Sequence, residues 1–420
     1  MKSVLQGFSI LVISLFFLAI FGWMSVEISK NTRSFGFLDE PVKWMTSFPN
    51  LFKQSVKEVQ TLPGTFIETA KAFNKINKLD TSILVLTTFS DKNNTRTIAL
   101  VDLKTDETLH SWNIENPYTT TDRIFNPYLL PNKDLLYSFE GKGLLRIDST
   151  GNEIWKQDEI EAHHSLNVDA DTNIWVCSFD KSNLNIGGYT VDGHERTFKD
   201  NFISKVDIHS GKLLFHKSMG ELLFENNLSN YIMKSMNMDD PLHMNDVQPA
   251  LETTEFYQKG DVFISLKNPS IILHYRPMTN ELINLLEGPF ISQHDVDFYG
   301  DHSIVIFNNN VYEGLSFDRL ESPEVAPGKE YGAFTSNIVV YNFETKSYSV
   351  IGDSIFRANQ IFTYSEGLVE FIRPDMYFVE EQNSGKLWVI KDDEVVYKNV
   401  LKSQHLGYHH LPNWTRIIKQ

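Results

Sequence analysis

Cysteine is almost absent from this chain, which has only Cys177 among its 420 residues. A lone cysteine excludes an intrachain disulfide and a zinc site built from several cysteines. Acidic residues outnumber basic ones, with 54 Asp and Glu against 38 Lys and Arg and a formal net charge of -16. Such a chain lacks the broad basic surface that binds a polyanion, so we do not expect nucleic acid as a partner.

Long apolar runs are also missing, except near the N-terminus. From Val4 to Val26 the stretch VLQGFSILVISLFFLAIFGWMSV has no charged residue and is long enough to cross a membrane as a helix. Lys2 precedes the stretch and Trp23, an interfacial residue type, lies at its far end. No small-residue cleavage pattern follows, which favours a retained signal anchor over a cleaved signal peptide. We therefore predict membrane attachment, with the bulk of the protein on the periplasmic or extracytoplasmic side.

The composition changes between residues 31 and 79. Apolar residues occur at helical spacing on both sides of a Pro-Gly break at residues 63 and 64. They are Leu51, Val56, Val59 and Leu62 before the break, and Phe66, Ile67, Ala70 and Phe73 after it. The pattern predicts two short amphipathic helices, which either pack under the main domain or lie on the bilayer. The expected organisation is a signal anchor over 1–30, a helical stem over 31–79 and a main domain over 80–420.

The main domain shows six segments that each read as strand, polar turn and strand. They are IALVDLKTDETLHSW, LLRIDSTGNEIWK, ISKVDIHSGKLLFHK, IILHYRPMTNELINL, IVVYNFETKSYSVI and LWVIKDDEVVYKN. Each predicts a hairpin, and the spacing of roughly 45 to 70 residues is that of propeller blades enlarged by loops. We therefore predict an all-β fold, a six-bladed β-propeller, with a pair of β-sandwiches as the competing fold.

Apolar segments before the hairpins supply the inner strand pairs of the predicted blades. These segments are ILVLTTF, DLLYSFE, NIWVCSF, DVFISLK, SIVIFNN and DMYFVEE. The last stretch of the chain, YHHLPNWTRII, is expected to form a strand of the first blade and so to close the ring.

Three histidines precede strands of this domain in a related way. His164 lies ten residues before Ile174, and His294 lies ten residues before Ile304. His243 precedes its strand by a longer insertion. The innermost strand of each blade lines the central channel of a propeller, so residues at one register converge near the axis. We predict that the three histidines face one funnel from the third, fourth and fifth blades.

Three imidazoles can bind a metal ion, or they can act as nucleophile and acid/base groups without one. Lys267, in ISLKNPS, is expected to add a positive charge to the funnel. A cation beside the histidines opposes a metal and favours an anion. The pattern therefore favours transfer of a negatively charged group, with no metal and no cofactor.

The neighbours of the histidines are expected to have lesser roles. Asn245 either orients a substrate oxygen or caps a turn. Asp295 and Asp297 alternate along an extended strand after His294, so they should point away from it, and a turn-capping or surface role is preferred. His163 should likewise face away from its neighbour if that segment is extended.

The chain resembles the arylsulfotransferases, six-bladed propellers of the bacterial periplasm and cell envelope. These enzymes move a sulfuryl group from a phenolic sulfate ester to a phenol without 3'-phosphoadenosine 5'-phosphosulfate. The matching segments are AHHSLNVDADTNIWV, DPLHMNDVQPA, GDVFISLKNPSIILHYRP and SQHDVDFYGDHSIVIFNNN. The resemblance implies an aryl sulfate donor, a phenolic or other hydroxyl acceptor, and a nucleophile at His294 that becomes transiently sulfated. It also implies that His164 and His243 hold the sulfuryl oxygens or the phenolic oxygen.

One departure from the family concerns the strand motif S-x-R, where this chain has Ser265, Leu266 and Lys267. Lysine keeps the charge of the arginine but loses the planar fork that fits two oxygens of a sulfate. The alternative function is therefore a non-catalytic, membrane-anchored propeller that binds an anionic ligand or a glycan.

Overall fold

The computed structural model describes residues 2–29, 35–39, 41–42, 45, 65–92, 95–118, 123–180, 186–191, 194–235, 237, 239–311 and 335–418. The chain divides into two compact units, Met1–Leu62 and Pro63–Gln420. The stretch from Leu51 to Leu62, predicted as the first stem helix, lies outside the described residues.

The first unit contains one long helix, α1 (Lys2–Ser29), followed by the single-turn helix η1 (Gly36–Leu38). Between Ser9 and Glu27 the mean hydropathy of α1 is 2.3, and 6% of the stretch is buried within the protein. Apolar side chains such as Phe16 are exposed along it. The predicted apolar helix is therefore present, with the length and composition of a membrane span or of a signal sequence.

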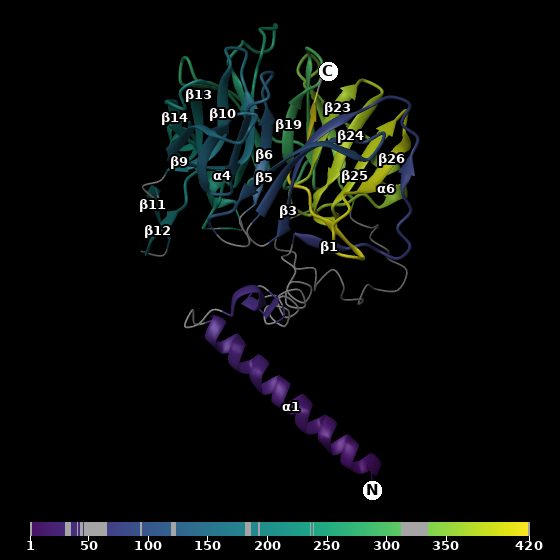
Figure 1. Cartoon of the computed structure of the whole chain (residues 1–420). Helices are drawn as coiled ribbons and strands as arrows, with labels where there is room; N and C mark the ends of the chain where they lie inside the picture. The colour runs from purple at the N-terminus through teal and green to yellow at the C-terminus, as the bar shows by residue number, and fades with distance from the viewer. Residues whose placement is uncertain are drawn as a thin grey trace. The chain divides into compact units, whose positions relative to one another are not determined.

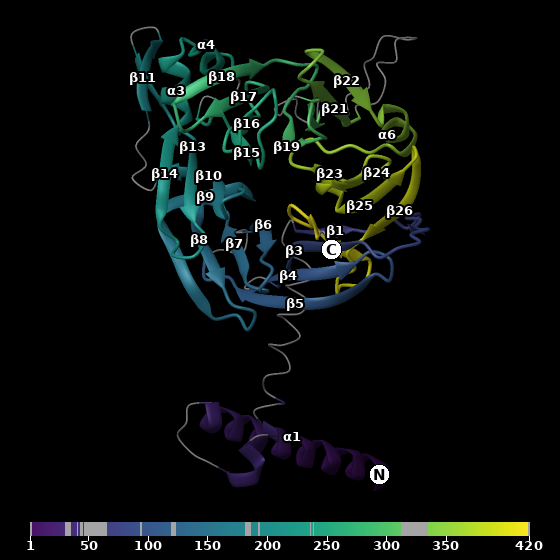
Figure 2. The same cartoon turned by 90° about the horizontal axis from the view of Figure 1, so that it is seen from above.

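The second unit is a ring of antiparallel strands (Figure 1). Four blades are separate sheets. The first contains β28 (Arg416–Ile418), β3 (Leu84–Lys92), β4 (Thr95–Asp102) and β5 (Glu107–Glu115), and another contains β15 (Met244–Pro249), β16 (Val262–Leu266), β17 (Ile271–Arg276) and β18 (Glu281–Leu286). The last two contain β19 (His294–Phe298), β20 (Ser303–Asn308), β21 (Asn337–Asn342) and β22 (Ser347–Ile351), and then β23 (Leu368–Arg373), β24 (Met376–Glu381), β25 (Lys386–Lys391) and β26 (Glu394–Val400). Strands β6, β15, β19 and β23 surround the centre in Figure 2, whereas β5, β14 and β26 lie at the rim.

The rest of the ring is one seven-stranded sheet. It contains β6 (Ile124–Leu129), β7 (Leu135–Phe139), β8 (Lys142–Ile147), β9 (Glu153–Val168), β10 (Asn173–Asp180), β13 (Phe202–Asp207) and β14 (Leu213–Ser218). The first part of β9 pairs with β8 and its last part pairs with β10. Strand β9 is thus the outermost strand of one four-stranded unit and the innermost strand of the next. The propeller prediction is confirmed, and the six predicted hairpins lie in six four-stranded units. Two of these units share β9, so they form one sheet and not two separate ones.

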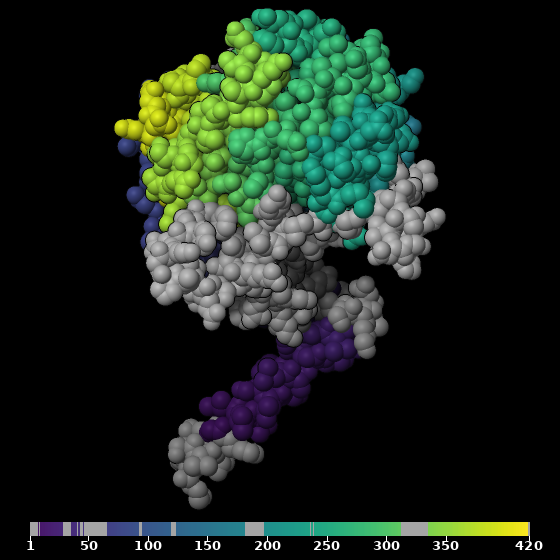
Figure 3. All heavy atoms as spheres, turned by 180° about the vertical axis from the view of Figure 1, so that it is seen from behind, coloured from purple at the N-terminus to yellow at the C-terminus, as the bar shows by residue number. Residues whose placement is uncertain are grey.

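Hydrophobic cores lie between neighbouring four-stranded units. Among the described residues, six clusters of buried side chains follow one another around the ring. In one of them Phe263 and Ile272 pack against Val296 and Ile304 of the next blade. Burying each such side chain contributes about 1.5 to 3 kcal/mol, so the blade faces hold the ring together. Viewed from the side in Figure 3, the surface passes from teal through green to yellow as the blades follow in chain order.

Short helices and a two-stranded sheet lie outside the blades. The helices are α3 (Met219–Glu225), α4 (Asn230–Met233), α6 (Asp353–Asn359) and η2 (Gln382–Ser384), and β11 (Ile186–Val191) pairs with β12 (His194–Phe198). The C-terminal strand β28 pairs with β3, which confirms the predicted closure of the ring.

The second predicted stem helix is not formed. Phe66 and Ile67 belong to β1 (Phe66–Glu68), which pairs with β27 (Tyr408–His410), and β2 (Ile76–Asn77) pairs with β26. Phe66 is buried and its ring lies 5.1 Å from the ring of His410. Burial against the propeller and pairing with strand edges therefore override the helical spacing of the apolar residues.

A repeated side-chain contact ties one blade to the next near the central channel. At equivalent positions of three successive innermost strands, a side-chain oxygen accepts the backbone N–H of the following blade. The pairs are Ser165 with Val247 at 3.0 Å, Asp246 with Val296 at 2.8 Å and Asp295 with Val369 at 2.7 Å. These contacts fix the relative heights of the innermost strands, and therefore the positions of the side chains that precede them.

Candidate active site

The three predicted histidines lie in or next to innermost strands, with His164 in the last part of β9, His243 directly before β15 and His294 at the start of β19. His164 and His294 occupy one register, two residues before Leu166 and Val296, which pair with equivalent residues of β10 and β20. In the fourth blade that register is held by Asn245. His243 lies two residues earlier, so the prediction of one shared position is correct for two histidines and wrong for the third.

The three imidazole rings nevertheless lie close together. The ring centroid of His164 lies 5.3 Å from that of His243 and 6.5 Å from that of His294. His164 and His243 have positive φ angles of 52° and 45°, which turn the backbone out of the extended form within β9 and directly before β15. The turn at His243 compensates for its different register, because it lets the side chain reach the same cluster.

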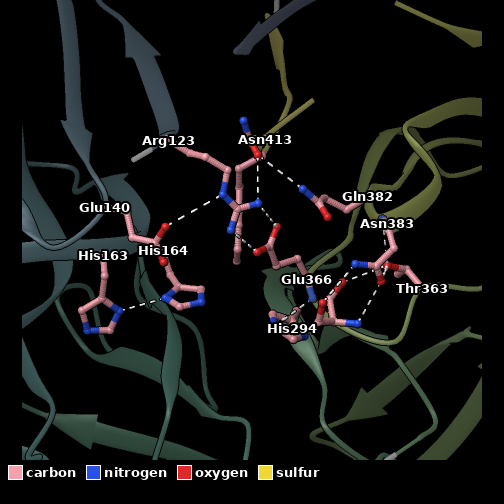
Figure 4. Close-up of polar contacts among 12 residues, drawn as sticks. Arg123, Glu140, His163, His164, His294, Thr363, Glu366, Gln382, Asn383 and Asn413 are labelled. Atoms are coloured by element: carbon pink, nitrogen blue, oxygen red, sulfur yellow. Dashed lines mark hydrogen bonds and ion pairs between the residues drawn. The ribbon is translucent and has the colours of Figure 1, made fainter. Parts of the chain in front are cut away.

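His294 is completely buried and held in one orientation (Figure 4). Its Nδ1 lies 2.8 Å from Oδ1 of Asn309 and 3.1 Å from the carbonyl oxygen of Ser292. The Asn309 amide nitrogen donates to the carbonyl oxygens of Thr363 and Glu366, so Oδ1 must be the atom that faces the ring. Two acceptors at Nδ1 place the hydrogen there and leave the lone pair on Nε2.

The Nε2 atom of His294 accepts a hydrogen bond of 3.3 Å from the backbone N–H of Glu366. Burial, and then the positive charge of Lys267, hold the pKa of His294 well below its ordinary value of 6.5. His164 has a lowered pKa for related reasons, first burial and then the neighbouring histidines and Lys267. His294 is therefore a neutral imidazole whose unprotonated Nε2 faces the Glu366 backbone N–H.

His163 also belongs to the cluster, contrary to the prediction that it faces away. Its Nδ1 lies 2.9 Å from Nδ1 of His164 (Figure 4). Side chains alternate only along an extended backbone. The backbone is not extended here, because His164 has a positive φ and a bulge lies opposite Val176 and Cys177. Burial lowers the pKa of His163 to about 3, so this imidazole is neutral and positions the ring of His164.

His243 forms a dyad with Asp240. Its Nδ1 lies 2.8 Å from Oδ2 of Asp240, whose Oδ1 accepts from the amide of Asn201 and from the backbone N–H of His243. Burial opposes ionisation of Asp240, but these hydrogen bonds outweigh it and bring its pKa to about 2. An ionised carboxylate at Nδ1 orients the ring and leaves Nε2 to exchange a proton.

Lys267 and Asn245 lie beside the histidines. Lys267 is buried, its backbone N–H donates to the carbonyl of His243 at 3.2 Å, and its charge acts on His164 and His294. The amide nitrogen of Asn245 donates to the carbonyl of Gln293 at 2.7 Å, which supports the segment that carries His294. Its Oδ1 is buried without a hydrogen-bond partner among the described residues.

An arginine that the sequence did not single out completes the cationic groups. Arg123 donates to Glu366 at 2.8 Å and to Oδ1 of Asn413 at 3.2 Å (Figure 4). Its guanidinium lies 4.6 Å from the ring centroid of Phe125, which stacks on His164 at 5.8 Å. Arg123 directly precedes β6, as His243 directly precedes β15, and a polar residue at the start of an innermost strand was the available signal.

Asp295 is buried rather than on the surface, so the preferred surface role is wrong. It has a φ of 55°, and its carboxylate accepts from the next blade as described above. The bulge between His294 and Val296 turns its side chain inward. Burial, and then the charges of Asp297 and Asp246, raise its pKa well above the ordinary value.

Further along the innermost strands lies a cavity of about 680 Å³. Asp246, Asp297 and Glu370 contribute carboxylates to its lining, and Arg416 contributes a guanidinium. Trp414 also lines the cavity, and its ring lies 5.9 Å from the ring of His164. The acidic lining disfavours an anion in the cavity, whereas Lys267 and Arg123 favour one at the histidines. Within the described residues, no three acidic, histidine or cysteine side chains are placed to hold one metal ion.

Comparison with known families decides the relationship of this chain. The arylsulfotransferase (ASST) family matches residues 126–399, which include His164, His243, Lys267 and His294. The chain belongs to the arylsulfotransferase family. Aryl sulfotransferase chemistry is therefore its family-level activity, and aryl sulfates and phenols are the substrate classes of the family. No curated protein matches the chain.

One solved structure supports the fold of this arylsulfotransferase family member. A protein of unknown function from Bacteroides caccae is 13% identical, with a TM-score of 0.51, and the match covers 81% of this chain and 100% of that one. A streptogramin B lyase is 8% identical, with a TM-score of 0.42 and coverage of 81% and 88%. At these identities the first likeness bears on the fold alone.

Proposed function

We propose that this protein transfers a sulfuryl group from an aryl sulfate ester to a phenolic or other hydroxyl acceptor through a sulfohistidine at His294. The observation that carries the proposal is the fixed, neutral imidazole whose Nε2 faces a cluster of cationic and hydrogen-bonding groups. Imidazole is a nucleophile only when neutral, and His294 stays neutral because it is buried beside Lys267.

In the first half-reaction Nε2 attacks the sulfur atom while the bond between sulfur and the aryl oxygen breaks. The phenolate leaves with the bonding electron pair. Sulfuryl transfer, like phosphoryl transfer, uses a loose transition state whose charge spreads over the peripheral oxygens. The charge of Lys267 acts on His294, and the His164 ring lies 6.5 Å from the His294 ring, so both can stabilise that charge. The Nδ1–H of the sulfated ring stays bound to Asn309, which favours the positive charge that the ring acquires.

In the second half-reaction the acceptor oxygen attacks sulfur and the bond between sulfur and Nε2 breaks. The acceptor hydroxyl must lose its proton as it attacks. His243 takes this proton at Nε2, and Asp240 stabilises the imidazolium that forms. In the reverse sense His243 supplies a proton to a basic phenolate leaving group. We assign Asn245 as a substrate-binding residue, because its unpaired Oδ1 can accept a hydrogen bond from the incoming hydroxyl group before His243 takes the proton.

The proposal is tested by incubating the full-length protein in detergent with 4-nitrophenyl sulfate and a phenol. We expect nitrophenol release that requires the acceptor, with ping-pong kinetics, because donor and acceptor occupy the site in turn. If the protein binds sulfate but turns over none of the aryl sulfates with any acceptor, the result would contradict the enzyme and favour an anion-binding module.

The lowered pKa of His294 leads to a pH prediction. With 4-nitrophenyl sulfate the leaving group needs no protonation, so the first half-reaction reports on the nucleophile alone. Because His294 is already neutral at pH 6, its rate constant should change by less than about twofold between pH 8 and pH 6. Rapid-quench measurement across this range checks it. A fall of about fourfold toward pH 6, as for a histidine of ordinary pKa, would contradict the assignment.

We also propose that α1 anchors the protein with the propeller on the extracytoplasmic side. The support is the apolar helix from Ser9 to Glu27, with 6% of its length buried within the protein. Protease added to intact cells or spheroplasts should degrade the propeller while a cytoplasmic marker survives. Complete protection of the propeller until the membrane is dissolved would place it on the other side.

A further inference from the structure

The Arg123 and Glu366 side chains form an ion pair across the ring, from the start of β6 to the start of β23. One guanidinium nitrogen lies 2.8 Å from Oε1 and the other lies 3.4 Å from Oε2. The side chains retain 19% and 13% of their accessible surface. Among the described residues, Arg123 is the side chain that bonds the Glu366 carboxylate. The carboxylate is thus held at the rim of the site by a partner that an anion can also bind.

Glu366 contacts the site through both its side chain and its backbone. Its carboxylate neutralises Arg123, and its backbone N–H occupies the lone pair of His294 Nε2. One residue therefore covers both the nucleophile and the nearest guanidinium, as Figure 4 shows. A sulfuryl group bonded to Nε2 would take the lone pair, and the N–H would then face a sulfuryl oxygen.

The backbone around Glu366 cannot easily withdraw. Glu366 has a φ of 58° and Gly367 a φ of 92°, and a Cβ atom at Gly367 would lie 2.6 Å from the Thr363 side chain. Asn383 accepts from the backbone N–H groups of Tyr364 and Ser365. Because the loop is held at these points, an entering anion can displace the flexible carboxylate while the N–H stays in place.

We propose that Arg123 and the backbone N–H of Glu366 form a sulfate-binding subsite that the Glu366 carboxylate fills until a sulfate ester or sulfuryl group displaces it. A guanidinium offers two parallel N–H groups to two oxygens of a sulfate, as it does to a carboxylate. Asn413 holds the guanidinium in place during the exchange through its Oδ1. The subsite lies beside His294 on the side of β6 and β23, and Lys267 approaches from the fourth blade. The identity of the anion rests on the proposed function.

Titration calorimetry with sodium sulfate at constant ionic strength tests the subsite on the full-length protein. Glu366→Gln removes the nearer of the two carboxylates at Arg123, the other being Glu140 at 3.9 Å, and keeps the backbone N–H, so it should tighten sulfate binding about tenfold or more. Arg123→Gln should weaken binding about tenfold, and the double variant should bind like Arg123→Gln. Arg123→Lys should bind between the wild type and Arg123→Gln, because it keeps only a point charge.

A matched control comes from the second four-stranded unit. Asp134 and Arg146 form a similarly buried ion pair, with 9% and 11% of their accessible surface retained. Asp134→Asn should leave the sulfate dissociation constant unchanged. An unchanged or weaker affinity in Glu366→Gln, equal tightening in Asp134→Asn, or no sulfate binding by any variant would overturn the subsite.

The calorimetry separates this inference from the proposed function. Sulfate binding with the expected pattern, without turnover of any aryl sulfate, would support the subsite and contradict the proposed transferase function. Turnover by the wild type, with sulfate affinity unaffected by Glu366→Gln, would do the reverse. Thermal melting of each variant confirms that it is folded.

Discussion

Replacement of His294 by Asn is expected to abolish sulfuryl transfer. The variant side chain can still donate to Asn309, but it has no nitrogen lone pair to attack sulfur. Loss of a nucleophile typically lowers turnover by about 10⁴ or more, so the rate should fall to background. Intact-protein mass spectrometry after mixing with an aryl sulfate should show a gain of one sulfuryl group in the wild type and none in the variant.

Two companion variants make this result specific to His294. His216→Gln alters a histidine that bonds Ser204 in the outer strands of the third unit, and it should keep wild-type activity. Asn309→Ala removes the acceptor that orients His294, and misplacement of a reacting group of this kind costs about 10²-fold. A sulfated species or substantial turnover in His294→Asn would move the nucleophile to another residue.

The second large effect is expected at Lys267. Lys267→Met should lower the rate of aryl sulfate cleavage by about 10² to 10³, because a buried cation that faces developing negative charge is lost. Lys267 lowers the pKa of His294, so its removal should also raise that pKa and bring a fall in rate at low pH. A structural role alone would not shift the pH profile. Rates of cleavage across pH, with melting temperatures, check both effects.

Lys267→Arg distinguishes a working site from one that has drifted away from sulfate. The family motif has arginine here, and a guanidinium contacts two oxygens, so Lys267→Arg should keep or raise activity if the other groups are in place. Lys205→Met, which removes a lysine paired with Asp169, is the matched control and should leave the rate unchanged. Full activity in Lys267→Met would refute the charge role and leave Arg123 as the main anion contact.

The sequence predicted the propeller from its hairpins, because alternating strands and turns are local patterns that survive folding. It could not predict the continuity of β9, which depends on the pairing of one strand with two different neighbours. The segment around Phe66 shows the same limit. Its apolar spacing indicates a helix, but contact with β27, more than three hundred residues away, makes it a strand.

Two of the histidines were predictable because His164 and His294 share one register, and His243 joins them from a position two residues earlier. Their partners were not predictable from spacing. Asn309 orients His294 from the residue directly after the neighbouring strand β20, and Glu366 and Arg123 come from other blades. The inward direction of His163 and Asp295 depends on bulges and positive φ angles, which the strand pattern alone does not specify.

The amino-acid sequence by itself determined the apolar N-terminal helix, the repeated hairpins, the closing C-terminal strand and the positions of three histidines and one lysine along those repeats. These features depend on local periodicity and on residue type. Only the tertiary structure decided which side chains share the site. Ring closure and the contacts between blades bring His164, His243, His294, Arg123 and Glu366 from five different four-stranded units to one point. Burial at that point then sets their protonation, because it removes water and leaves the histidines beside a fixed positive charge.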